Sequence, residues 1–132
     1  MIPWEQILRL ILAVIMGLAI GLEREKSHKP AGLRTHMLVC LGSCLFTLVS
    51  LEFGLDPARV ASGVVAGIGF LGAGAIIAER ERVVGLTTAA SLWVTAAIGL
   101  TVGVGNYILA IVSAILTLLI LFSRAIFKKN LF

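Results

Sequence analysis

Apolar residues gather in five long runs along this chain, separated by short breaks. A helix rises about 1.5 Å per residue, so roughly 20 mostly apolar residues can cross about 30 Å of hydrocarbon. Five segments meet that requirement, at residues 4–22, 35–54, 58–78, 85–103 and 106–123. The pattern predicts an all-α integral membrane protein in which residues 1–132 form a single domain of five transmembrane helices.

The breaks between the runs differ in strength. The first, residues 23–34, carries seven charged or histidine side chains. The second is an Asp-Pro pair at 56–57, which is typical of a turn, and the third reads Glu-Arg-Glu-Arg at 79–82. The fourth, Gly-Asn at 105–106, has no charge, but the run from 85 to 123 is far too long for one span, so a turn is predicted there.

Lysine and arginine fall almost entirely on one side of this arrangement. The loops after the first and third spans and the tail after the fifth share a side with nine cations, against Arg9 and Arg59 on the other. Short loops rich in Lys and Arg stay in the cytoplasm, which predicts an outside N-terminus and a cytoplasmic C-terminus. The basic side is also expected to contact membrane lipids, including anionic headgroups. The nine cations are Arg24, Lys26, Lys29, Arg34, Arg80, Arg82, Arg124, Lys128 and Lys129.

The first two pairs of spans carry similar end sequences. Ala-Ile-x-x-Glu-Arg-Glu occupies residues 19–25 and again 75–81, and Gly-Leu-x-Thr begins at Gly32 and again at Gly85. We interpret this as a parallel two-helix internal repeat plus a fifth helix, with a pseudo-two-fold axis along the membrane normal. Chance similarity between short charged helix ends is the alternative.

Such a repeat gathers charged helix ends and hydroxyl groups at the cytoplasmic surface, either as a binding site or as an orientation anchor. For the hydroxyls that open the span 85–103, packing against neighbouring carbonyls is favoured over lining a polar cavity. The functional candidates are Glu23, Arg24, Glu25, Arg34, Thr35, Glu79, Arg80, Thr87 and Thr88.

Glycines recur in small-xxx-small spacing, at 17/21, 63/67 and 99/103. In lipid, helices associate by close backbone approach over small residues. The span 58–78 is richest in glycine and is expected to be the central helix, and a homo-oligomer, with a dimer favoured, is expected as well. The packing candidates in this span are Gly63, Gly67, Gly69, Gly72 and Gly74.

His36, Cys40 and Cys44 form one stripe on the second span, but together they extend over about 12 Å and cannot ligate one ion. A metal held by His36 and Cys40 with ligands from elsewhere is the alternative to a plain helix interface. Arg9 is expected to pair with Glu5 one turn away. No catalytic set of residues is visible, so neither an enzyme nor a cofactor is expected.

Partners other than membrane components are not indicated. The aromatic and basic stripes of nucleic-acid binders are missing, so no nucleic acid is expected. The glycine run at 67–72 matches a dinucleotide fingerprint, but it lies inside a span and not after a strand, so the match carries no weight.

Four ordered blocks, at residues 21–25, 29–36, 67–74 and 85–93, resemble the MgtC/SapB family over nearly the whole chain. The blocks begin Gly-Leu-Glu-Arg-Glu, Lys-Pro-Ala-Gly-Leu-Arg-Thr-His, Gly-Ile-Gly-Phe-Leu-Gly and Gly-Leu-Thr-Thr. The resemblance is to the membrane domain alone: better-known members carry a soluble cytoplasmic domain after the fifth helix, whereas this sequence stops at Phe132.

The resemblance implies a multi-pass protein of a bacterial-type inner membrane, involved in magnesium homeostasis, acid adaptation or virulence. It favours a regulator of other membrane proteins, such as the F-type ATP synthase. A small transporter or channel for Mg²⁺ or another cation is the alternative, although no acidic residue lies deep in a span and Mg²⁺ prefers oxygen ligands.

Overall fold

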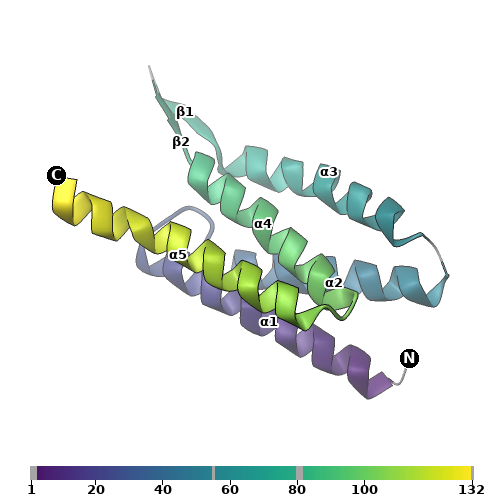
Figure 1. Cartoon of the computed structure of the whole chain (residues 1–132). Coiled ribbons are helices and arrows are strands. Elements are labelled where there is room, and N and C mark those ends of the chain that lie inside the picture. Colours follow the sequence, from purple (N-terminus) through teal and green to yellow (C-terminus); the bar gives the residue numbers. More distant parts are fainter. Residues whose placement is uncertain (1–2, 55, 80–81, 132) are drawn as a thin grey trace.

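The computed structural model describes residues 3–54, 56–79 and 82–131, with side chains at 3–54, 56–76 and 83–126. Within these ranges five helices are long and apolar enough to span a membrane, which confirms the predicted fold class (Figure 1). Their bounds are α1 Pro3–Lys26, α2 Leu33–Glu52, α3 Pro57–Ala75, α4 Leu86–Gly103 and α5 Tyr107–Leu131.

A short β-hairpin joins α3 to α4. The helix predicted to reach residue 78 ends at Ala75, and strands β1 (Ile77–Glu79) and β2 (Arg82–Val84) pair antiparallel, with Ile77 opposite Val84. The helical extension was therefore wrong. A short apolar run cannot by itself distinguish helix from strand, and the β-branched residues here favour the strand.

The three segments rich in Lys and Arg lie at one end of the bundle. The α1–α2 connection, the β-hairpin and the C-terminal end of α5 are together, whereas the N-terminus and the other two turns lie at the opposite end (Figure 1). This is the grouping of loops that the charge pattern requires. Which end faces the cytoplasm, and the two-fold relation between the helix pairs, stay predictions.

Helix α4 is the centre of the bundle, and the prediction that the glycine-rich third span is central was wrong. Helix α4 contacts α1, α2, α3 and α5. Half of its most apolar stretch is buried, compared with 17% for α3. Helix α3 lies at the edge, where it packs mainly on α4 (Figure 1).

Helices α1 and α4 approach the backbone of α2 closely over glycines. A Cβ added to Gly17 would lie 2.6 Å from the carbonyl oxygen of His36, and one added to Gly99 would meet the carbonyl oxygen of Cys40. On α3, Gly72 faces Ala89, but among the described residues nothing from another element lies within 4 Å of a Cβ added at Gly63, Gly67, Gly69 or Gly74. A packing role of those four glycines against another chain stays a prediction.

Candidate functional site

A buried ion pair stands at the end of α1 where the charged loops gather. The Arg24 Nε donates to Glu23 Oε2 at 2.8 Å, and the Ser27 hydroxyl donates to Glu23 Oε1 at 3.0 Å. Arg24 is only 1% exposed and Glu23 8%. Since an unpaired charge at such depth is costly, each residue makes the burial of the other tolerable.

A second buried polar contact joins α2 to α4 beside this pair. The His36 Nε2 lies 2.8 Å from the Ser91 hydroxyl, and the His36 Nδ1 donates to the Gly32 carbonyl at 2.9 Å. The Ser91 hydroxyl is also 2.7 Å from the carbonyl oxygen of Thr88. His36 packs over Gly21, so the imidazole lies within about one turn of Arg24 along α1.

Of the predicted candidates, the structure brings Glu23 and Arg24 together and buries Thr88 beside Ser91. It adds His36 and Ser91 to this polar cluster. The His36–Ser91 pairing was missed, because nothing in the spacing of either helix shows which residue faces it across the bundle. The only sequence signal was the position of both polar residues within apolar spans.

The remaining predicted residues have separate roles or surroundings. The Glu25 carboxylate accepts from the Leu33 amide at 2.6 Å and so caps the start of α2, where no side chain of its own does so. Arg34 and Thr87 are exposed, and half-buried Thr35 lies apart from the ion pair, facing the space between α2 and α3. Glu79 lies in β1 with its side chain outside the described set, and Arg80 lies outside the described residues.

The metal alternative gains no support from the geometry. Both nitrogens of His36 are engaged, and Cys40 lies in an apolar cluster with Cys44. Among the residues that the structure describes, no three His, Cys, Asp or Glu side chains are grouped as a metal site.

Arg9 has a different partner from the one predicted. Its Nη1 donates to the Gly103 carbonyl at 2.8 Å and its Nε donates to the Tyr107 hydroxyl at 3.1 Å. The described side chains show no ion pair with Glu5, so that prediction was wrong. The last carbonyls of α4 lack helical partners, and the guanidinium satisfies one of them.

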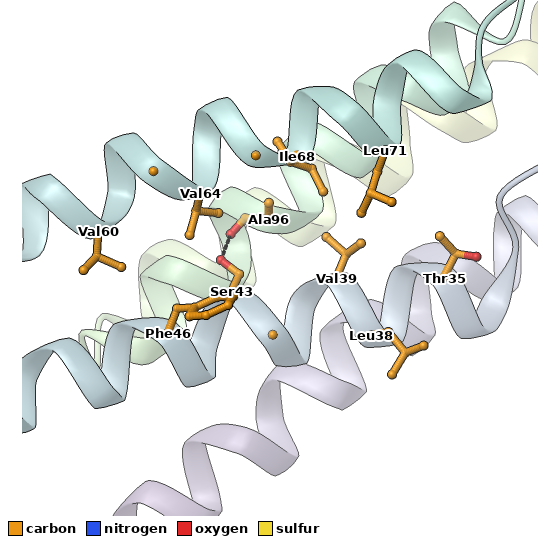
Figure 2. A pocket seen from close by; sticks show the side chains of 13 residues that line it. Thr35, Leu38, Val39, Ser43, Phe46, Val60, Val64, Ile68, Leu71 and Ala96 are labelled. Atoms are coloured by element: carbon orange, nitrogen blue, oxygen red, sulfur yellow. Dashed lines mark hydrogen bonds between the residues drawn. The ribbon is translucent and has the colours of Figure 1, made fainter.

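An apolar groove of about 690 Å³ runs between α2 and α3. Figure 2 shows Val60, Val64, Ile68 and Leu71 pointing from α3 towards α2, with Ala96 of α4 behind them. Its one described polar contact is internal, because the Ser43 hydroxyl donates to the Ala96 carbonyl. Glycines contribute to both walls: Gly42 on α2, and Gly63 and Gly67 on α3.

Five apolar spans around a buried polar cluster define a multi-pass membrane protein. The model of the MgtC family matches residues 10–130, so the chain belongs to that family, as its sequence blocks indicated. No solved structure matches it.

Three relatives show the extent of the similarity. The chain is 51% identical over 127 residues to the Escherichia coli K12 protein named "Putative magnesium transporter YhiD", with 89% of this chain and 59% of YhiD covered. It is 44% identical over 119 residues to MgtC of Salmonella typhimurium, covering 89% of this chain and 52% of MgtC. It is 43% identical over 129 residues to SrpB of Synechococcus elongatus, covering 86% and 71%. The chain thus spans little more than half the length of YhiD and MgtC.

Proposed function

We propose that this chain is the membrane part of a regulator that acts in magnesium homeostasis within a bacterial-type inner membrane, without enzymatic activity. It acts by helix contact with other membrane proteins, and the F-type ATP synthase is the partner that the family resemblance implies. The name of YhiD supports the link to magnesium.

The groove between α2 and α3 carries this proposal. No hydrophobic force drives helices together in lipid, so an interface needs a surface that admits a neighbouring backbone closely. Gly42, Gly63 and Gly67 provide such a surface, because no described atom beyond the adjacent backbone of the same helix lies within 4 Å of an added Cβ. The occupant that fits is an apolar transmembrane helix of the partner, with its side chains seated between Val64 and Phe46.

The packing of the interior favours a regulator over a transporter. A tight apolar cluster lies between α1, α2, α4 and α5, with Ile20, Cys44, Ile98 and Val102 each at most 1% exposed. The buried hydroxyl of Thr95 donates to a carbonyl of its own helix. Mg²⁺ sheds water reluctantly and requires oxygen ligands in its place, which such a core does not offer.

Leucine substitutions test the groove. We expect Gly63→Leu and Gly67→Leu to lower co-purification of the F-type ATP synthase by about tenfold, because the added side chain fills the contact surface. The matched control is Gly69→Leu, on the same helix and equally open but outside the groove. Equal capture by Gly67→Leu and Gly69→Leu would contradict the proposal.

The test also distinguishes a second copy as the occupant. If the purified chain alone forms the expected dimer in nanodiscs and only the groove variants dissociate it, the groove is a dimer interface and not the site of a different partner.

Ion flux tests the transporter alternative. Purified protein in liposomes is expected to pass neither Mg²⁺ nor protons faster than protein-free vesicles. Flux that disappears in Glu23→Gln would overturn the regulator proposal in favour of transport.

A further inference from the structure

A second cavity, of about 310 Å³, lies between α1 and α5 near the end of the bundle that holds the charged loops. It shares Glu23 and Ser27 with the buried ion-pair cluster and no residue with the groove between α2 and α3. Its polar wall comprises Glu23, Lys26 and Ser27 of α1 with Arg124 of α5, and its apolar wall includes Leu121 and Phe122.

Within the part of the chain whose side chains the structure describes, the polar wall has more positive than negative charge. Glu23 is already neutralised by Arg24, and its second oxygen accepts from Ser27. Among the described side chains, neither Lys26 nor Arg124 has a carboxylate partner. Two cations on helices distant in sequence therefore line one cavity, and their mutual repulsion falls when an anion lies between them.

The depth of the cavity matches a membrane surface. Arg124 follows the start of α5 at Tyr107 by 17 residues, a rise of about 26 Å, which is close to the hydrocarbon thickness of about 30 Å. Phe122 in the cavity wall is exposed, and so is Leu22, one turn before Lys26 on α1. The same opening thus meets headgroups on its charged side and acyl chains on its apolar side.

We propose that this cavity binds one anionic phospholipid, with its phosphate between Lys26 and Arg124 and its acyl chains along Leu22 and Phe122. The apolar wall favours a lipid over a free phosphate ester, since a soluble anion gains nothing from it. This inference does not depend on the proposed regulatory function.

The test is native mass spectrometry of the purified chain released from nanodiscs of phosphatidylglycerol mixed with phosphatidylcholine. We expect one phosphatidylglycerol retained per chain and little phosphatidylcholine. Lys26→Gln and Arg124→Gln should each lower that retention about fivefold, the size expected of one cation at an anionic membrane surface.

The matched control is Lys29→Gln, which removes the same charge from the adjacent loop but lies outside the cavity. An equal loss of lipid in Lys29→Gln, or equal retention of phosphatidylcholine, would overturn the site. Excess glycerol 3-phosphate distinguishes the two sources of phosphate: failure to displace the lipid supports the proposal, and displacement shows a site for a soluble anion instead. Circular dichroism and gel filtration check that each variant remains folded.

Discussion

At the scale of single residues, the adjacent Glu23 and Arg24 dominate the polar end of the bundle. The Arg24 Nε lies 2.8 Å from Glu23 Oε2, so the two opposite charges neutralise each other. The Nη1 of Arg24, however, is buried with no hydrogen-bond partner among the described atoms. A buried donor without a partner carries a desolvation cost. Such a pair is therefore sensitive to the loss of either member.

This sensitivity gives the first prediction. Arg24→Gln should destabilise the protein by about 3–5 kcal/mol, because the Glu23 carboxylate then lies buried without its counter-charge. The double variant Glu23→Gln/Arg24→Gln should lose clearly less stability than Arg24→Gln, because neither of the two buried charges remains. Thermal unfolding in detergent measures both, and a double variant less stable than Arg24→Gln would refute the argument.

Glycine substitutions give a second prediction, in which only one of two positions loses stability. Gly17→Ala should destabilise by about 1–3 kcal/mol, because its Cβ would meet the α2 backbone. Gly74→Ala, in open space, should be neutral or stabilising by up to about 1 kcal/mol from helix propensity alone. The comparison is made by thermal unfolding of each variant, and equal effects would show that intrinsic propensity, not contact, decides.

At the scale of elements, the sequence predicts the helices and turns that depend on the local pattern of apolar and charged residues. The five spans follow from the lengths of the apolar runs. The turn at 105–106 was correctly predicted because the apolar run from 85 to 123 is too long for one span. The hairpin at 77–84 was not predicted, because Ile77 and Ala78 of its first strand continue the apolar run of α3. Glycine spacing correctly predicted close helix contact at Gly17. It also predicted such contact on α3, where it is not found within the described structure, because spacing alone does not show whether another helix lies opposite the glycines.

The turn between α4 and α5 is stabilised by hydrogen bonds from Arg9 of α1, and this contact gives the third prediction. Arg9→Ala removes both hydrogen bonds of the guanidinium and should cost about 1.5–3 kcal/mol, whereas Tyr107→Phe, which removes one, should cost about 0.5–1.5 kcal/mol. Amide hydrogen exchange near Gly103 should accelerate in Arg9→Ala. The control is Arg59→Ala, at an exposed arginine, where unchanged exchange is expected and a similar acceleration would contradict the assignment.

At the scale of the whole molecule, the helices around α4 are not packed equally closely. Helices α1, α2 and α4 meet closely over glycines, whereas α3 leaves a groove against α2 and α5 leaves a cavity against α1. The sequence indicates that polar groups gather at one end, since charge and topology together require it. It does not indicate where the helices separate, because that depends on side chains from distant segments. Both openings lie apart from the tightly packed core of α1, α2 and α4, which is the arrangement that the proposed contacts with other membrane components require.

The orientation of the molecule gives the last prediction, because nine cations at one end and two at the other should hold the charged end in the cytoplasm. Single cysteines introduced at His28 and Phe53, which are exposed near opposite ends of the bundle, can report this orientation. The native Cys40 and Cys44 are fully buried, so background labelling should be low. In intact cells a membrane-impermeant maleimide should label Phe53→Cys readily and His28→Cys only after permeabilisation. The reverse pattern would move the Glu23–Arg24 pair and the lipid cavity to the outer face, where cytoplasmic partners could not reach them.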